Sequence, residues 1–366
     1  MAELRGSVTL VGAGPGAPDL LTVRGERALR AADAVVYDAL APKSLLALAP
    51  ADAERIDVGR RGHEEPPRTQ EEINALLVEL ARQGKRVVRL KGGDPYVFGR
   101  GGEEASACRA AGVPFEVVPG VSAAIGALAY AGIPVTDRRH AASFAVVTGH
   151  KDPTRVREAI RWAELGSAVD TLVILMGMRN LPELVAQLLA GGRAADTPAA
   201  AVMNGTRAGQ RVVEAPLASL PDAVAAAGLG APAAVVIGDV VRLREELAWF
   251  ERLPLFGRRV LVTRPAGQSE TLCRALEEAG AEAVRLPMIQ TVEEPLGRSL
   301  AAAIQAGKRF DLVVFTSANG VRALASQLAA QGAEPAAVAS QAVCVGDATA
   351  AAADAAGFPV LRLGRG

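Results

Sequence analysis

Several features that mark particular classes of protein are scarce or absent in this sequence. Aromatic residues make up only 4% of its 366 residues, so its hydrophobic cores must consist mainly of Ala, Val and Leu. The formal net charge is zero, whereas a general nucleic-acid binder usually carries a basic excess. We therefore expect no nucleic-acid partner, and we expect local arginines rather than a global field to hold any anionic ligand.

Long apolar runs and paired cysteines are absent as well. Because the sequence has no run of about 18 uncharged apolar residues, we expect no membrane span, and residues 1–5 lack the apolar core of a signal peptide. The cysteines and histidines are too scattered for a disulfide framework or a metal cluster. They are Cys108, Cys273, Cys344, His63, His140 and His150. The sequence thus predicts a cytoplasmic protein with ordinary thiols and no metal site.

What the sequence does contain is a regular alternation of short apolar runs and longer helical patterns. Its length is typical of two or three domains. In residues 71–83, for example, apolar side chains recur at helical spacing. The apolar runs that predict strands are residues 8–11, 34–37, 87–90, 115–118, 144–148, 171–175 and 234–237. This alternation predicts an α/β protein with largely parallel sheets.

Two polar or charged segments mark candidate boundaries between domains. The first, at residues 132–142, is polar and basic, and the second, at residues 242–259, is rich in charge and precedes a fresh strand at residues 259–263. The predicted domains are an N-terminal α/β domain (1–137), a second α/β domain (138–244), a linker (245–258) and a third segment (259–366).

The first glycine-rich motif, GAGPG at residues 12–16, follows a predicted strand and precedes a helix. Glycine permits positive φ and a close approach of the backbone to a ligand. Gly12, Gly14 and Ala17 fit a dinucleotide fingerprint, and Asp38 follows the second strand, where a ribose-binding carboxylate can sit. By itself this motif leaves open a nicotinamide-dependent oxidoreductase and a plain tight turn.

The second motif is more specific: LKGGDPYVFGRGGEE at residues 90–104. It has six glycines or prolines within residues 92–102, which excludes a regular helix or strand and predicts an ordered loop of special purpose. Asp94 can accept hydrogen bonds from a ribose or an amino group. Arg100 and Glu103 are three residues apart, so they share a face if a helix starts there.

Three further motifs also follow predicted strands: VPGVSAA at residues 118–124, LMGM at 175–178 and MNGT at 203–206. In open parallel sheets, ligands bind at the carboxyl ends of the strands. The motifs therefore predict one ligand site built from several loops.

Taken in order, the motifs GAGPG, YD, GGDPYVFGRGGEE, VPGVSA, GIPVT, TGH, LMGM, NGT and APAAVVIGDVV resemble the tetrapyrrole methylase family over about residues 8–244. Within that family they are similar to the uroporphyrinogen-III C-methyltransferases. Those enzymes transfer two methyl groups to uroporphyrinogen III and form precorrin-2 for siroheme and cobalamin. The resemblance implies a tetrapyrrole methylase fold and a homodimer. It also implies that S-adenosylmethionine lies in a cleft between two α/β domains and leaves as S-adenosylhomocysteine.

The resemblance also implies roles for individual residues. The family's proposed proton acceptor falls on Asp38. Members often have Lys as a proton donor where this sequence has Arg60; because arginine stays protonated, we expect an electrostatic role there. The implied cofactor contacts are Pro15, Gly92, Gly93, Asp94, Val97, Ser122, Ala123, Met176 and Gly205. Ser122 stands where the family commonly has Thr, which keeps a hydroxyl group.

The implied substrate has eight carboxylates, which need guanidinium partners. The resemblance supports Arg100 and Arg138 as substrate-binding residues, and Glu103 either orients Arg100 or meets a pyrrole N–H. Further candidates, for which an ordinary surface arginine is the alternative, are Arg60, Arg61 and Arg139.

From residue 259 onward the sequence resembles the uroporphyrinogen-III synthase family, whose product the methylase consumes. The matching pieces include VLVTRP at residues 260–265, FTSANGV at 315–321 and VGDAT at 345–349. Because that family has two lobes and only about 110 residues are present here, we expect an incomplete domain without synthase activity. The polar residues Thr316, Ser317 and Asn319 either line a substrate cleft or form a turn.

Other functions remain open at this point. A nicotinamide-dependent oxidoreductase explains the first motif but not the second. A tetrapyrrole carrier without catalysis is suggested by Arg60 and the incomplete third segment. Methyltransferases that act on later corrin intermediates are a nearer rival, although the synthase-like segment favours uroporphyrinogen III.

Overall fold

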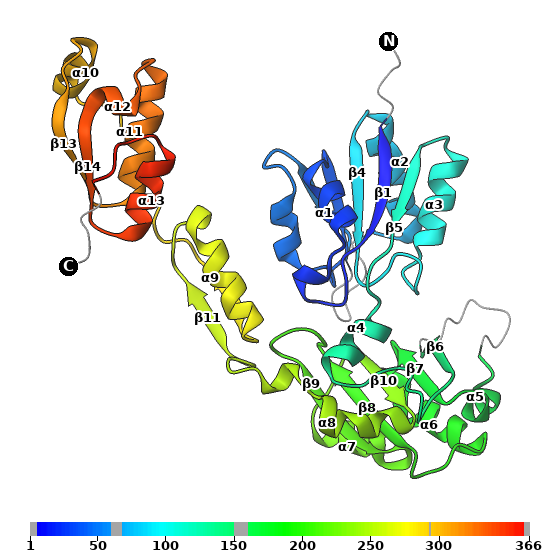
Figure 1. The fold of residues 1–366 in the computed structure, drawn as a ribbon. Coiled ribbons are helices and arrows are strands. Elements are labelled where there is room, and N and C mark those ends of the chain that lie inside the picture. Colours follow the sequence, from blue (N-terminus) through cyan, green and yellow to red (C-terminus); the bar gives the residue numbers. More distant parts are fainter. Residues whose placement is uncertain (1–5, 60–67, 150–159, 293, 362–366) are drawn as a thin grey trace. The chain divides into compact units, whose positions relative to one another are not determined.

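In a computed structural model of the protein, residues 6–59, 68–149, 160–292 and 294–361 are described. The chain forms two compact units. The larger consists of Met1–Val260 with Leu272–Val284, and the smaller consists of Leu261–Thr271 with Arg285–Gly366. The larger unit contains two lobes, each built around its own five-stranded sheet (Figure 1).

The first lobe is an α/β layer structure with an entirely parallel sheet. Its strand order is β3-β2-β4-β1-β5. The strands are β1 (Ser7–Gly12), β2 (Ala34–Tyr37), β3 (Glu54–Asp57), β4 (Arg86–Lys91) and β5 (Phe115–Val118). The helices are α1 (Val23–Arg30), α2 (Gln70–Arg82) and α3 (Gly101–Ala110), with short 3-10 turns η1 (Pro18–Leu20) and η2 (Lys43–Leu48). The carboxyl ends of all five strands consequently lie along one edge of the sheet.

Both faces of this sheet are covered, which explains why its strands are apolar on both sides. Val8 and Leu10 pack with α2 and α3, whereas Val11 and Val35 pack with α1 and η2. The helix predicted at residues 71–83 is confirmed as α2. It begins with a capping box in which the side chains of Thr69 and Glu72 exchange hydrogen bonds with backbone N–H groups.

The second lobe has a mixed sheet, with strand order β6-β7-β10-β8-β9. Its strands are β6 (Phe144–Thr148), β7 (Thr171–Leu175), β8 (Pro198–Met203), β9 (Arg211–Pro216) and β10 (Ala233–Ile237). Its helices are α4 (Ala123–Tyr130), α5 (Trp162–Ala168), α6 (Leu181–Ala190) and α7 (Leu220–Ala226), with 3-10 turns η3 (Met178–Asn180) and η4 (Leu217–Ser219).

The expectation of largely parallel strands holds for the first sheet and is wrong for the second. There only β6 and β7 run parallel, and the pairs β7–β10, β10–β8 and β8–β9 are antiparallel. The sequence reading missed β8 and β9. The connection between them, residues 204–210, is too short for a parallel crossover, which needs a dozen or more residues.

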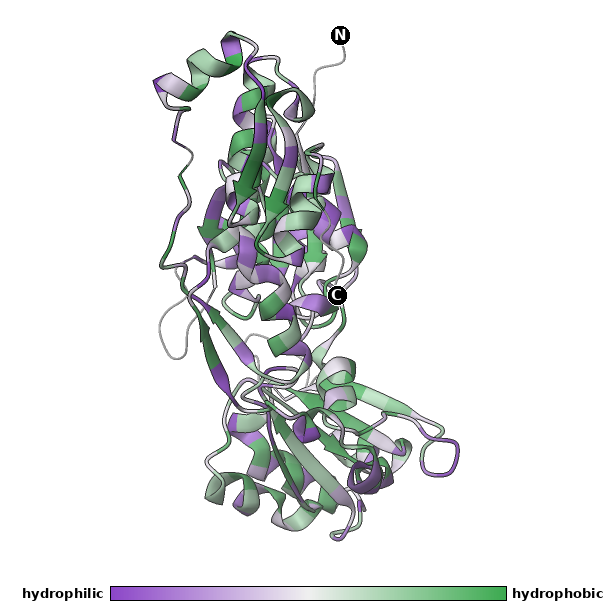
Figure 2. Cartoon of the chain, turned by 60° about the vertical axis from the view of Figure 1, so that its left-hand side comes forward, coloured by the Kyte–Doolittle hydropathy of each residue, from purple (hydrophilic) through white to green (hydrophobic). Residues whose placement is uncertain are grey.

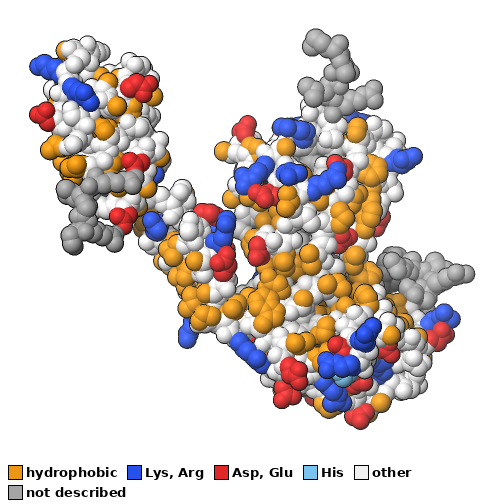
Figure 3. All heavy atoms as spheres, in the orientation of Figure 1, with side chains coloured by type: hydrophobic (Ala, Val, Ile, Leu, Met, Phe, Trp, Pro, Cys, Tyr) orange, Lys and Arg blue, Asp and Glu red, His pale blue; other side chains and the backbone are white. Residues whose placement is uncertain are grey.

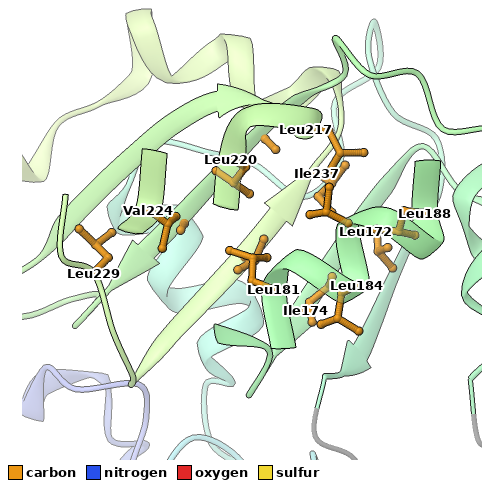
Figure 4. Close-up of a cluster of buried hydrophobic side chains, with 14 residues drawn as sticks. Leu172, Ile174, Leu181, Leu184, Leu188, Leu217, Leu220, Val224, Leu229 and Ile237 are labelled. Carbon is orange, nitrogen blue, oxygen red and sulfur yellow. The ribbon is translucent and has the colours of Figure 1, made fainter. Parts of the chain in front are cut away.

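The core of the second lobe lies on both faces of its sheet. On one face, α6 and α7 bury a cluster of leucines and valines against β7 and β10 (Figure 4). On the other face, Ala124, Leu128 and Ala131 of α4 and its C-terminal end pack against Val173 and Val236. Helix α4 thus belongs to the second sheet, although it precedes residue 137, where the sequence predicts the first domain to end.

The residues that follow η5 (Asp239–Leu243) pack against the second lobe. They form α8 (Arg244–Leu247) and η6 (Phe250–Arg252). The Arg244 guanidinium donates to the carbonyl oxygen of Ala131 at 2.6 Å and to the carboxylates of Glu214 at 2.7 Å and Glu251 at 2.5 Å. Gln210 Nε2 donates to the other oxygen of Glu251 at 2.9 Å.

Four aromatic rings reinforce this contact, with centroid separations from 4.8 to 5.5 Å. They belong to Tyr130, Trp249, Phe250 and Phe256. The predicted linker, residues 245–258, therefore packs against the second lobe over much of its length.

After the second lobe, strands β11 (Arg259–Val262) and β12 (Glu282–Arg285) form a two-stranded sheet, with α9 (Ala266–Glu278) between them in sequence. The residues of these three elements are divided between the larger and the smaller unit. Beyond them, β13 (Phe310–Phe315) and β14 (Ala339–Cys344) pair in parallel. The accompanying helices are α10 (Arg298–Gln305), α11 (Ala318–Ala330), α12 (Pro335–Val338) and α13 (Asp347–Ala355). Their core includes Phe315, Val321, Leu328 and Phe358.

Polar residues of the motif at 315–321 form the start of α11. Ser317 Oγ accepts a hydrogen bond from Gly320 N at 3.2 Å and so caps the helix. Asn319 Oδ1 accepts from Gln268 Nε2 at 2.9 Å. These contacts give Ser317 and Asn319 local structural roles within the smaller unit.

The distribution of apolar and charged residues over the fold agrees with the zero net charge and the apolar strand pattern of the sequence. Apolar residues concentrate in the strands (Figure 2), and Lys and Arg side chains are interspersed with Asp and Glu on the visible face (Figure 3). In the part of the chain that the structure describes, no helix is long and apolar enough to span a membrane. All three cysteines are free; Cys108 and Cys273 are buried. Burial raises the pKa of the Cys108 thiol to about 11.

Replacing Glu251 by Ala is expected to destabilise the larger unit, because it leaves Arg244 and Gln210 without their shared partner. We expect the free energy of unfolding to fall by about 1–3 kcal/mol. Urea unfolding followed by tryptophan fluorescence measures this change, since Trp162 and Trp249, the two tryptophans of the chain, both lie in that unit. The matched control is Glu246→Ala at an exposed position of the same segment. Equal midpoints for the two variants would contradict this account.

Candidate active site

Three glycines hold the loops after β1, β4 and β5 in direct contact. A Cβ atom on Gly12 would lie 2.5 Å from Gly120 Cα and 2.6 Å from the carbonyl oxygen of Gly93. A Cβ on Gly120 would overlap that same carbonyl oxygen. Gly14 and Gly93 also exchange backbone hydrogen bonds of 3.2 and 2.8 Å. No other residue type can replace Gly12 or Gly120 without moving the backbone of a neighbouring loop.

The Asp94 carboxylate links the loop after β4 to the loop after β5 by hydrogen bonds. Its Oδ1 accepts from the backbone N–H of Tyr96 at 2.8 Å, and its Oδ2 accepts from the backbone N–H of Gly120 at 2.9 Å. The sequence motif predicts that Asp94 accepts hydrogen bonds from a ligand. Here each oxygen already accepts one from the protein, and each carboxylate oxygen keeps capacity for another.

Strained backbone is concentrated in the predicted motifs. Among the described residues, five other than glycine have φ between 51° and 69°, in the left-handed region. They are Phe98, Arg100, Met176, Asn204 and Thr206. Such conformations cost about 1–3 kcal/mol each and gather at functional sites. All five follow β4, β7 or β8, in loops that the sequence analysis had selected.

The loop between β8 and β9 connects the second lobe to the first. Thr206 Oγ1 accepts from the backbone N–H of Ala17 at 2.8 Å, and Arg207 Nη2 donates to the carbonyl oxygen of Leu40 at 3.2 Å. Thr206 is held in turn by Gln210, whose Oε1 accepts from its backbone N–H at 2.9 Å. A Cβ on Gly205 would overlap Ala127, so α4 packs directly against this loop.

The structure brings together most of the residues predicted to bind the cofactor. Gly93 lies beside Ser122 and Ala123 at the start of α4, and Pro15 packs against Gly126 in the same helix. Ser122 caps α4 by accepting from Ala124 N at 3.3 Å. Met176 follows β7 in the second lobe.

Several apolar side chains in these loops and at the start of α4 remain exposed: Tyr96, Val97, Phe98, Ile125 and Met176. Backbone polar groups, a carboxylate and apolar side chains in adjacent loops are the combination that a nucleoside ligand needs. The residues present therefore fit such a ligand.

The pair Arg100 and Glu103 forms at the start of α3, as their spacing predicts. Arg100 Nε and Nη2 donate to the two oxygens of Glu103 at 2.8 and 2.6 Å. This hydrogen bond with Arg100 lowers the pKa of the Glu103 carboxyl group. Both side chains are about half exposed, so the guanidinium is oriented and accessible.

Within the part of the chain that the structure describes, the other arginines predicted to bind substrate form no hydrogen bond or ion pair with the loops above. Arg138 is exposed in a turn closed by hydrogen bonds between Asp137 and Ala141, and Arg139 pairs with Asp137 at 3.3 Å. Arg60 and Arg61 lie outside the described residues. Among the residues that are described, no three His, Cys, Asp or Glu side chains are arranged to hold a metal ion.

The predicted proton acceptor Asp38 belongs to a group of four charged side chains that the sequence motifs do not identify, and the other three are buried. Arg89 donates to Asp38 Oδ1 at 2.5 Å and to Glu104 Oε1 at 2.9 Å. Lys91 Nζ lies 3.0 Å from Glu104 Oε1 and 3.8 Å from Asp38 Oδ2. Burial opposes the charge of Arg89, but Asp38 and Glu104 together raise its pKa. Burial and the nearby Arg89 lower the pKa of the Lys91 ammonium group.

A signal for this group was present in the sequence. Arg89 interrupts the apolar run 87–90, and Lys91 follows at the spacing that places both side chains on one face of a strand. A charged residue inside a buried strand requires a partner. The sequence does not say which carboxylates supply it, because Asp38 and Glu104 come from distant elements.

The chain belongs to the tetrapyrrole (corrin/porphyrin) methylase family, whose sequence model matches residues 7–221. This confirms the resemblance inferred from the motifs. A second model, that of uroporphyrinogen-III synthase, matches residues 270–365, in agreement with the resemblance noted for the third segment.

Solved structures support the same family. The chain is similar to the uroporphyrin-III C-methyltransferase from Thermus thermophilus in complex with S-adenosylhomocysteine, with 41% identity and a TM-score of 0.55 over 65% of this chain and 100% of that one. It is also similar to a cobalt precorrin-4 methyltransferase, with 27% identity and a TM-score of 0.58 over 64% of this chain and 95% of that one.

Two curated relatives are longer than this chain. The porphyrin biosynthesis protein HemD of Ruminiclostridium josui is 42% identical over 89% of this chain and 64% of its own length. The siroheme synthase of Pseudomonas paraeruginosa is 54% identical over 67% of this chain and 52% of its own length. The chain thus spans between half and two thirds of the length of these relatives.

Replacing Gly120 by Ala is expected to push the loop after β5 away from the loops after β1 and β4, because the added Cβ would overlap Gly12 and Gly93. We expect a loss of about 1–3 kcal/mol in the free energy of unfolding, as for other overpacked sites, and faster amide exchange at Gly93 and Tyr96. Hydrogen–deuterium exchange with mass spectrometry measures both effects. The control is Gly230→Ala, where an added Cβ has open space. Unchanged exchange in Gly120→Ala would show that the loops do not depend on this contact.

Proposed function

We propose that this protein uses S-adenosylmethionine to methylate uroporphyrinogen III at carbon, twice, and so produces precorrin-2 for siroheme or cobalamin. The observation that carries this proposal is the glycine-packed meeting of the loops after β1, β4 and β5. It occurs in a chain that matches a uroporphyrin-III C-methyltransferase over that protein's whole length.

S-adenosylmethionine fits the chemistry of the loops. When bound, it supplies an electrophilic methyl group and leaves as S-adenosylhomocysteine. The glycine backbone at residues 92–93 allows a ligand to approach closely, and the exposed Val97 and Met176 offer apolar contact. Gly205, whose missing side chain makes room for Ala127 of α4, is proposed to contribute its backbone. The remaining proposed cofactor contacts are Pro15, Asp94, Ser122 and Ala123.

Arg100 and Arg138 are proposed to bind the carboxylates of the substrate. Guanidinium groups bind carboxylates bidentately, and Glu103 holds Arg100 in a defined orientation before the substrate arrives. Glu103 either keeps that role or meets a pyrrole N–H. For Arg60 the proposed role is electrostatic.

Asp38 is proposed to accept the proton that the substrate loses after methylation. A pyrrole carbon of the substrate forms the new C–C bond while the methyl–sulfur bond breaks and its electron pair stays on sulfur. The proton released from the tetrapyrrole then passes to the carboxylate of Asp38, which is 29% exposed. Catalysis comes mainly from the alignment of the two reactants, which can contribute on the order of 7–11 kcal/mol.

A methyltransferase acting on a later corrin intermediate is the second candidate. The similarity to a cobalt precorrin-4 methyltransferase favours it. Higher identity to the uroporphyrin-III enzyme and the synthase-like match at residues 270–365 favour uroporphyrinogen III instead.

The same proposal includes the cellular location, the oligomeric state and the place of the cofactor between the domains. We expect a cytoplasmic homodimer, with the cofactor in a cleft between domains at residues 1–137 and 138–244. Sedimentation velocity of the purified protein tests the dimer. For the segment 259–366, the absence of synthase activity stays a prediction, which the appearance of uroporphyrinogen III from hydroxymethylbilane would contradict.

The Arg100→Ala variant tests the substrate assignment. Purified protein is incubated anaerobically with uroporphyrinogen III and S-adenosylmethionine labelled on its methyl group. We expect label in a dimethylated tetrapyrrole. Because a charged hydrogen bond contributes about 1.5–3 kcal/mol, we expect the KM for the tetrapyrrole to rise about 10- to 150-fold in the variant, with unchanged affinity for S-adenosylhomocysteine by calorimetry.

The matched control is Arg109→Ala, which removes an exposed arginine from the same helix and should leave both constants unchanged. Transfer to a later corrin but not to uroporphyrinogen III would favour the second candidate. No binding of S-adenosylmethionine or S-adenosylhomocysteine would rule out both.

A further inference from the structure

Four charged side chains pack together beneath α3, and three of them are almost completely shielded from solvent. Arg89, Lys91 and Glu104 expose between 0% and 3% of their side chains, whereas Asp38 exposes 29%. The group therefore has a single partly open end, which is the carboxylate of Asp38.

Both oxygens of the Asp38 carboxylate face a cation from β4. Arg89 Nη2 lies 2.5 Å from Oδ1, and Lys91 Nζ lies 3.8 Å from Oδ2. Since Arg89 and Lys91 are two residues apart in one strand, they point to the same face of the sheet. This two-point contact restricts rotation of the carboxylate about its Cβ–Cγ bond.

Glu104 connects the same two cations to α3. Its Oε1 accepts from Arg89 at 2.9 Å and from Lys91 at 3.0 Å. Its Oε2 is buried and has no hydrogen-bond partner among the residues the structure describes. Helix α3 begins directly after Arg100. Asp38 and Arg100, the proposed proton acceptor and substrate anchor, are thus joined through β4, Glu104 and α3.

Stability alone does not account for this arrangement. Burying an ion costs several kcal/mol, and exchanging a buried ion pair for packed apolar residues is often neutral or stabilising. A charge network at the carboxyl ends of strands, next to strained loops, is more typical of a functional site.

We propose that Arg89, Lys91 and Glu104 are positioning residues for the methylation, which hold the Asp38 carboxylate in a fixed place relative to the substrate-binding start of α3. This inference rests on the proposed function, in which Asp38 accepts the proton of the substrate. A displacement of about 1 Å can cost about 100-fold in rate. Loosening of the group should therefore lower kcat and leave cofactor affinity unchanged.

A double-mutant cycle between Glu104 and Asp38 tests this role. Glu104→Gln keeps the side-chain volume and removes the charge that both cations share, while Asp38→Asn removes the proton acceptor. We expect Glu104→Gln alone to lower kcat about 10- to 100-fold, with the Kd for S-adenosylhomocysteine within about twofold of the parent value. Because the effect acts through Asp38, we expect a loss of less than about threefold in the Asp38→Asn background.

The control is Glu71→Gln, the same substitution at an exposed position of the neighbouring α2, which should leave kcat unchanged. Urea unfolding checks that each variant is folded. If Glu104→Gln does not fold, the charge-balanced variant Lys91→Met/Glu104→Gln takes its place in the cycle. Equal losses in both backgrounds, or no loss in a folded variant, would overturn the proposal. Absence of methyl transfer by the unmodified protein would instead contradict the proposed function and, with it, this inference.

Discussion

The structure depends on the contact between three backbone segments at one edge of the first sheet. Because β1, β4 and β5 are parallel neighbours, their carboxyl ends emerge side by side, and Gly12, Gly93 and Gly120 let the following loops touch. Asp94 joins two of these loops through its two oxygens. The loops place the start of α4 at the same point, and α4 in turn packs on the second sheet. The glycine contact therefore positions both the loops of the candidate site and the passage from one lobe to the next.

The charged side chains around Asp38, at the same edge of the first sheet, are both fixed in position and paired with opposite charges. A ligand site needs polar groups that keep their positions, yet polar groups beneath helices are costly unless they are paired. Here two cations from β4 share two carboxylates, so the four formal charges cancel. Only Asp38 reaches the open end of the group. The pairing keeps the interior neutral and leaves one carboxylate partly exposed to solvent.

Much of the fold was predictable because its signals are local. Apolar runs predicted β1, β2, β4 and β5 of the first sheet and β6, β7 and β10 of the second, helical spacing predicted α2, and the density of glycine and proline identified the loop after β4. In the second sheet β8 and β9 were missed because β8 consists largely of alanine, β9 is interrupted by two charged residues, and the pairing of β8 with β10 depends on residues distant in the sequence. For the same reason Arg89 and Lys91 could be seen in the sequence, but their partnership with Asp38 and Glu104 could not. The role of Thr206 at the contact between the lobes likewise depends on a distant partner, the backbone N–H of Ala17.

The central claim is that the loops at the carboxyl ends of β1, β4 and β5 form the cofactor site together with the loop after β8. A crystal structure of the protein with S-adenosylhomocysteine tests it most directly. The account predicts the adenosyl group against residues 92–94 and Gly205, with the glycine contact and both backbone hydrogen bonds of Asp94 intact. Binding at another edge of either sheet, or binding that requires Gly12 and Gly120 to separate, would contradict it.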